Sequence, residues 1–144
     1  EVIKRLAPYC KKIQVAGSIR RRKAIVHDID FVLIPSDLWN LQHEITGLGP
    51  ARVSGEKLKR VNYNGVQVDL YFASEQTWAT LLLIRTGSTE SNMRLAWLAK
   101  KRGWRLKASG DGLFNENGER IAGDSEESIY QALDLPYQRP EERR

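Results

Sequence analysis

The fold of this chain is decided by a stretch near its start, residues 15–34, which reads VAGSIRRRKAIVHDIDFVLI. An apolar run ends in Gly17-Ser18, four consecutive basic residues follow, and the carboxylates Asp28 and Asp30 open a second apolar run. This order predicts a strand, a phosphate-binding turn and a second strand. Successive side chains of a strand alternate between its two faces, so Asp28 and Asp30 should project from the same side.

Both parts of this stretch have the chemistry of a nucleotide-binding site. Paired carboxylates attract a cation of the magnesium kind, which completes its shell with water and substrate phosphates. A Gly-Ser turn can bring backbone N–H groups and a hydroxyl against a phosphate without a Cβ in the way. The alternative interpretation is a hairpin with a basic loop and an acidic strand start on a solvated face. A second feature is needed to separate the two.

That feature is residues 66–72, VQVDLYF, in which apolar residues alternate with Gln67, Asp69 and Tyr71. The alternation predicts a half-buried strand with one carboxylate on its open face. If this strand neighbours the first, three carboxylates converge. Three are enough to hold two metal ions about 3.5–4 Å apart for phosphoryl or nucleotidyl transfer.

Together these motifs resemble the nucleotidyltransferase superfamily and, within it, the family X DNA polymerases, the group that contains polymerase beta. The resemblance spans nearly the whole chain and also rests on Thr86-Gly87-Ser88, Asn92-Met93-Arg94, Gly112-Leu113-Phe114 and Leu135-Pro136-Tyr137 with Pro140-Glu141. It implies a template-directed DNA polymerase that adds dNTPs to a DNA 3′ end in gap filling or repair. The implied cofactor is a pair of Mg²⁺ ions, for which Mn²⁺ can substitute, and the implied partner is gapped or primer–template DNA.

The resemblance also assigns roles to single residues. Asp28 and Asp30 would bridge both metal ions as catalytic residues, and Asp69 would bind the one that activates the primer 3′-OH. The incoming nucleotide would be bound by Gly17, Ser18, Arg21, Arg85, Gly87 and Asn92. DNA would be contacted by Arg94, Lys57, Lys59, Lys100 and Lys101, with Lys57 and Lys59 presenting their cations beside Asp69. Arg20 is expected to face solvent or the DNA backbone, and His27 and Trp97 are expected to be packing residues.

Three features depart from the family pattern. Ile84 and Arg85 stand where members often carry an aromatic pair against the sugar of the incoming nucleotide, so we expect tolerance of ribonucleotides. Tyr71 stands where an arginine often follows the third aspartate. Only one short helix precedes the expected palm, so base-excision lyase activity is expected to be absent from this chain.

The pattern predicts an α+β protein of two lobes. Residues 1–75 should form a nucleotidyltransferase palm, a mixed β-sheet with flanking helices, and residues 76–144 a small α/β thumb-like lobe. Helices are expected over 1–11, 36–45, 76–85 and 88–103, and a last one after Asp124 as its cap. Strands are expected over 12–16, 27–34, 57–62, 66–72, 104–106, 112–114 and 119–121.

Composition agrees with a nucleic-acid partner. The 144 residues are 41% hydrophobic and carry a net charge of +5, which favours a polyanion. A single cysteine excludes an intrachain disulfide. The sequence has no membrane-length apolar run and no signal peptide, so we expect an intracellular monomer, cytoplasmic, nucleoid, nuclear or viral.

Two other functions stay open. One is a nucleotidyltransferase that works without a template on DNA or RNA ends or on another acceptor. The other is a non-catalytic DNA-binding module, which the presence of all three carboxylates disfavours.

Overall fold

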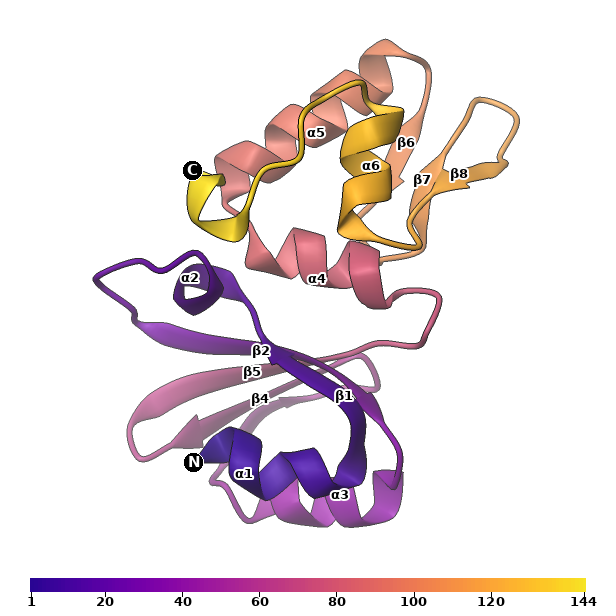
Figure 1. Cartoon of the computed structure of the whole chain (residues 1–144). Helices are drawn as coiled ribbons and strands as arrows, with labels where there is room; N and C mark the ends of the chain where they lie inside the picture. Colours follow the sequence, from indigo (N-terminus) through magenta and orange to yellow (C-terminus); the bar gives the residue numbers. More distant parts are fainter.

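The computed structural model describes residues 1–144 and has two lobes, each built on its own sheet (Figure 1). The N-terminal lobe holds a five-stranded mixed sheet in the order β1-β2-β5-β4-β3. Its strands are β1 (Cys10–Val15), β2 (Asp28–Pro35), β5 (Val66–Phe72), β4 (Leu58–Tyr63) and β3 (Ala51–Ser54). The C-terminal lobe holds an antiparallel sheet of β6 (Arg105–Lys107), β7 (Gly112–Phe114) and β8 (Arg120–Ala122). The predicted α+β class is confirmed.

The centre of the larger sheet is β2, which pairs antiparallel with β1 and parallel with β5. Its residues 31–34 are buried on both faces of the sheet. Phe31 and Leu33 join the core on one face, while Val32 joins a smaller cluster on the other. The apolar run that the sequence showed is therefore a central strand that is covered from both sides.

Helices cover the first face of this sheet. α1 (Val2–Leu6) continues into the 3₁₀ turn η1 (Ala7–Tyr9), and α3 (Leu38–Thr46) lies beside them (Figure 1). Asp37 caps α3 by accepting a hydrogen bond from the backbone N–H of Asn40. Leu6 and Leu41 are fully buried against the sheet, so this face carries the main core of the lobe.

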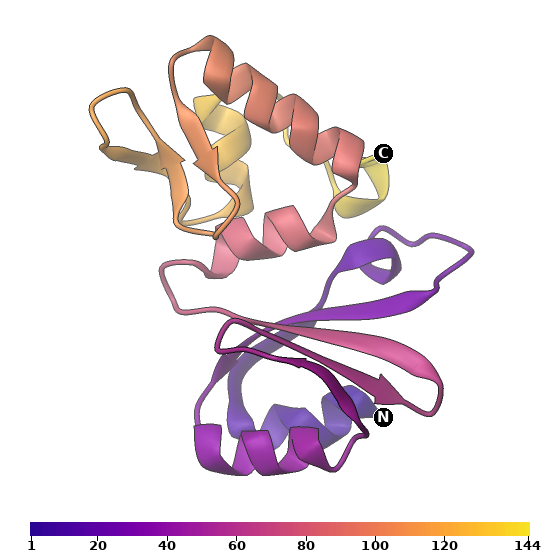
Figure 2. The same ribbon diagram turned by 180° about the vertical axis from the view of Figure 1, so that it is seen from behind.

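A single helix, α4 (Trp78–Thr86), lies between the two lobes in both views (Figure 1 and Figure 2). Leu81 and Leu82 pack with Val32 of the larger sheet. Leu83 instead belongs to the core of the C-terminal lobe. Because neighbouring helical residues point in different directions, one helix serves both cores and fixes the position of one lobe on the other.

The C-terminal lobe is completed by α5 (Thr89–Lys101), α6 (Glu126–Ala132) and the 3₁₀ turn η2 (Pro140–Glu142). Its core gathers Leu83, Leu95, Leu113, Ile129 and Leu133. None of the helices of the chain is long and apolar enough to span a membrane.

Three local predictions were wrong. Gly17–Arg20, expected as a turn, form the single helical turn α2. Strand β3 was not predicted, because this mostly exposed edge strand has only four residues, too few for its alternation to stand out in the sequence. The last helix is capped by Ser125, with Ser128 as the reciprocal partner, in place of Asp124.

A buried ion network joins the lobes and corrects the expectation for Arg20. Its guanidinium donates to both carboxylate oxygens of Glu126, at 2.6 and 2.8 Å, and to Thr86 Oγ1 at 2.7 Å. Glu126 also accepts from Arg143 Nη1 at 2.9 Å, and Arg143 is 1% exposed. Burial by itself would raise the pKa of Glu126, but the hydrogen bonds and charges of the two arginines outweigh it and lower that pKa below its ordinary value of 4.5.

We expect Glu126→Gln to lower the free energy of unfolding by about 3 kcal/mol at pH 7, because it leaves two buried guanidinium groups without a counter-charge. A carboxylate with a lowered pKa stabilises the fold above its unfolded pKa, and this contribution is lost as the pH falls through the folded pKa. Urea unfolding of both proteins should therefore show a gap at pH 7 that narrows steadily below pH 4.5. Glu75→Gln, which removes an exposed partner of Lys11 and Lys12, is the control and should change little. A gap that is independent of pH would contradict the assignment of this stability to the ion network.

Candidate active site

The sheet brings the three predicted carboxylates to one face. Asp28 and Asp30 lie two residues apart on β2, and the parallel register pairs Asp30 with Asp69 of β5. Val32, the next residue of the same parity, packs with α4, so all three acids lie on the α4 side of the sheet. The groups near these acids therefore come from α4 and from the segments next to it.

A cavity of about 460 Å³ lies over two of the acids, between the sheet, α2 and the junction of α4 with α5. It is lined by Asp28 and Asp30 together with all of the predicted nucleotide-binding residues, namely Gly17, Ser18, Arg21, Arg85, Gly87 and Asn92. Five further residues complete the wall: Ile25, His27, Tyr71, Ile84 and Thr89. His27 was expected to pack, but it precedes the first residue of β2, so strand alternation does not govern its side chain.

Gly17 allows the closest approach in this site. Its φ is +59°, in the left-handed region that favours glycine, and a Cβ there would overlap Asp30 Oδ2 and lie 3.1 Å from Asp30 Cγ. The Gly-Ser pair therefore does more than turn the chain. It leaves the space that the Asp30 carboxylate occupies.

Two guanidinium groups also line the cavity, those of Arg21 and Arg85. Arg21 donates through Nη1 to the carbonyl of Thr86, at the end of α4, and Arg85 stacks with its Cζ 4.2 Å from the ring centre of Tyr71. The Nε atoms of both arginines are buried and have no hydrogen-bond partner. Buried donors are normally satisfied, so these two unpaired groups are exceptions among the residues that line the cavity.

The negative charges of Asp28, Asp30 and Asp69 repel one another. Burial raises the pKa of Asp30 to about 6, and the nearby charges of Asp69 and Asp28 act in the same direction, while Arg85 opposes them. A carboxylate that is crowded in this way is stabilised as an anion by any cation brought beside it. The cavity therefore combines an acidic wall suited to a cation with a basic wall suited to phosphate.

Asp69 is placed differently from its two neighbours. It is 4% exposed, does not line the cavity, and accepts hydrogen bonds from Arg60 Nε at 2.7 Å and Arg60 Nη2 at 3.2 Å. As the side chains stand, no group of three His, Cys, Asp or Glu residues is arranged to hold a metal ion. Asp28 and Asp30 are open to the cavity, whereas the third acid is held by Arg60.

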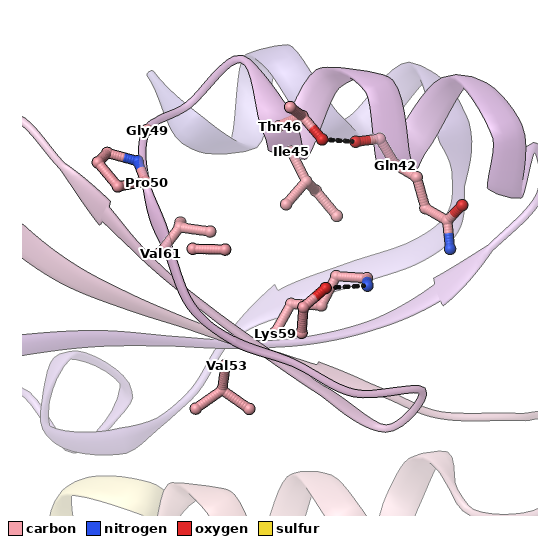
Figure 3. Close-up of a pocket in the computed structure, with 10 residues that line it drawn as sticks. Gln42, Ile45, Thr46, Gly49, Pro50, Val53, Lys59 and Val61 are labelled. Atoms are coloured by element: carbon pink, nitrogen blue, oxygen red, sulfur yellow. Dashed lines mark hydrogen bonds between the residues drawn. The ribbon is translucent and has the colours of Figure 1, made fainter.

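The cation beside Asp69 was predicted wrongly. In β4, Arg60 pairs with Asp69, whereas Lys59 lies one residue away and faces the opposite side of the sheet with Val61. There it donates from Nζ to Ser54 Oγ at 3.2 Å and lines a second cavity of about 540 Å³ beside α3 (Figure 3). That cavity contains no carboxylate, so its size alone does not make it the active site. Lys57 is exposed just before β4 begins.

The other predicted DNA-contacting residues lie on α5, whose first turns line the acidic cavity through Thr89 and Asn92. Arg94, Lys100 and Lys101 are all exposed. Trp97, expected as a packing residue, is 58% exposed, and Lys101 Nζ lies 4.9 Å from its ring centre. Asn92 donates from Nδ2 to the carbonyl of Ile84 at 2.8 Å, so it also holds the α4–α5 junction.

Comparison with known proteins gives two matches. The family model of the DNA polymerase beta thumb matches residues 81–144. The DNA polymerase/3′-5′ exonuclease PolX of Bacillus subtilis (strain 168) is 29% identical over 136 residues, which make up 90% of this chain. The chain spans 24% of the length of that relative.

We expect Gly17→Ala to cost far more stability than alanine at another glycine of similar conformation. Gly118 has a φ of +79° and no atom within 4 Å of its added Cβ, so Gly118→Ala should cost only the backbone term, about 1–2 kcal/mol. Gly17→Ala carries that cost and the overlap with Asp30 as well. Urea unfolding of the two variants gives the comparison. Equal losses would show that the Asp30 carboxylate moves aside freely.

Proposed function

Because the chain is related to the family X DNA polymerases, we propose that it is a template-directed DNA polymerase that transfers nucleotides from dNTPs to a DNA 3′ end, in gap filling or repair. The observation that carries this proposal is a cavity lined both by two carboxylates, Asp28 and Asp30, and by two arginines, Arg21 and Arg85. A nucleoside triphosphate with its cation presents the complementary charges. Such a cavity suits nucleotidyl transfer better than DNA binding alone.

In this reaction the 3′ oxygen of the DNA strand attacks the α-phosphorus, and the bond between that phosphorus and the pyrophosphate breaks. Two Mg²⁺ ions, or Mn²⁺ in their place, would supply Lewis acidity at the attacking and leaving oxygens. The residues fit such cations, because the pKa of Asp30 is raised by burial and neighbouring acids, and because Asp69 already holds a cationic group. Asp28, Asp30 and Asp69 would be the ligands.

Binding of the triphosphate falls to Ser18, Arg21 and Arg85. Ser18 lies on α2, Arg21 directly follows this helical turn, and Arg85 is near the end of α4, so their groups come from two separate elements. Guanidinium groups suit phosphate oxygens because their donors form a planar fork. The half-buried Asn92 and the backbone at Gly87 complete the nucleotide side of the cavity.

DNA would lie along α5, which begins at the cavity and carries Arg94, Lys100 and Lys101 on its exposed surface. These side chains would neutralise backbone phosphates, a contact that fixes position without reading sequence. Lys59 has no part in this proposal, since it faces the other side of the sheet.

We expect Asp28→Asn, Asp30→Asn and Asp69→Asn each to abolish primer extension with little change of the fold, because each removes a cation ligand at nearly constant volume. Extension of a labelled primer with and without template, with circular dichroism of each variant, is the measurement. Addition that ignores the template would favour a transferase acting on free DNA or RNA ends. Near-wild-type extension by folded Asp30→Asn protein would remove the proposal.

We further expect poor discrimination between dGTP and GTP. The wall near the expected sugar position is formed by Ile84 and by Arg85 stacked on Tyr71, and a flexible donor can bind a 2′-hydroxyl where a rigid aromatic would exclude it. The ratio of kcat/KM values for dGTP and GTP should stay below about 200, the range that a pocket of this kind supplies. Arg85→Phe should raise the ratio. A wild-type preference above about a thousandfold, beyond that range, would show that the backbone alone excludes the hydroxyl.

A further inference from the structure

The strongest contact of the third carboxylate is with a side chain of its own sheet. β4 pairs antiparallel with β5 and places Arg60 directly opposite Asp69. The guanidinium donates from Nε to Oδ1 at 2.7 Å and from Nη2 to Oδ2 at 3.2 Å, while Gln67 Nε2 lies 3.4 Å from Oδ2. Both oxygens of Asp69 are therefore engaged by neutral or cationic donors of the protein.

This pairing is asymmetric in exposure. The Asp69 side chain is 6% exposed and the Arg60 side chain 33% exposed, so the carboxylate is fixed in the sheet while the guanidinium has a route to solvent. A buried carboxylate beside Asp30 would be costly without a counter-charge, and Arg60 supplies one. Of the two partners, only Arg60 can leave without breaking the sheet.

The same contact conflicts with metal binding. A divalent cation and a bidentate guanidinium use the same carboxylate oxygens, so they exclude one another in this arrangement. In the present arrangement Asp69 is engaged by Arg60 and does not line the cavity that Asp28 and Asp30 line. The acids form a three-ligand site only after the guanidinium has moved.

We propose that Arg60 is a resident counter-ion of Asp69 that a divalent cation must displace, so that Arg60 sets the affinity of the site for the cation. The inference rests on the proposed function in taking Asp69 as a cation ligand. Arg60 balances the buried carboxylate while the cation is absent, and its release to solvent accompanies cation binding. It acts as a positioning residue, through Asp69.

Mn²⁺ titration of the nucleotide-free chain, with free Mn²⁺ measured by electron paramagnetic resonance, tests the proposal directly. Loss of a charge-assisted pair corresponds to a factor of about ten or more, so Arg60→Gln should tighten Mn²⁺ binding by about tenfold. Arg60→Lys keeps the charge but loses the planar fork, so its affinity should lie between the two. Arg5→Gln is the matched control, because Arg5 is also 33% exposed and pairs at 3.1 Å with Glu44, remote from the site. It should change the Mn²⁺ affinity by less than about twofold, because neither Arg5 nor Glu44 lines the cavity or pairs with Asp69, and an exposed charge is largely screened by solvent.

A second measurement reports on Arg60 itself. In the free protein the Nε–H of Arg60 is held by Asp69 and should give a protected resonance in a ¹⁵N spectrum, assigned by its absence in Arg60→Lys. Saturating Mg²⁺ should shift this resonance toward the values of an exposed arginine. The Nε–H resonance of Arg5 should stay in place.

The outcomes separate this inference from the proposed function. Equal Mn²⁺ affinity of wild type and Arg60→Gln would overturn the counter-ion role of Arg60, and so would an Arg60 resonance that Mg²⁺ does not shift. Neither result would contradict the proposed polymerase function. Mn²⁺ binding that is unaffected by Asp69→Asn would overturn the counter-ion role as well. The polymerase proposal is tested by primer extension with Asp30→Asn, a variant that leaves Arg60 in place. Near-wild-type extension by that variant would contradict the polymerase proposal without deciding the role of Arg60.

Discussion

The parallel pairing of β2 with β5 is the interaction on which the rest of this structure depends. It sets Asp30 level with Asp69 and, with Asp28 two residues earlier, concentrates negative charge on one face of the sheet. Apolar residues on both faces of β2 stabilise the pairing. Their burial offsets the free energy that the repulsion between the acids costs. Positive charge near the site is needed to balance this concentration of negative charge.

The cavity exists because a single helix serves two cores. α4 packs Leu82 against the sheet and Leu83 into the C-terminal lobe, which brings Arg85 and the start of α5 over the acids. The N-terminal lobe supplies Asp28, Asp30 and Arg21, whereas α4 and α5 supply Arg85 and Asn92, so neither lobe alone forms the cavity. The position of the lobes is therefore part of the site, and the contact of Arg20 with Glu126 fixes this position close to Gly17 and Ser18.

The sequence was sufficient for features that depend on local periodicity. Alternation placed Asp28, Asp30 and Asp69 on one face, and the residues matched to the nucleotide all line one cavity. It was insufficient for ion pairs, because Arg20 finds Glu126 across 106 residues and no local pattern marks that partner. The pairing of Arg60 with Asp69 could have been predicted from the sequence. The Asn64-Gly65 turn pairs Tyr63 with Val66, and the same antiparallel register pairs residue 60 with residue 69.

The buried Glu126 and the half-buried Asp30 show how the same physics gives opposite results at two acids. Burial opposes ionisation at both Glu126 and Asp30, yet the pKa of Glu126 is lowered while that of Asp30 is raised to about 6. Glu126 is surrounded by two arginines and needs nothing more. Asp30 has the charges of Asp69 and Asp28 beside it, Arg85 opposes them only in part, and Arg60 is committed to Asp69. An acid left short of positive charge, in a cavity that Arg21 and Arg85 also line, is the arrangement that the proposed binding of a cation together with a phosphate would use.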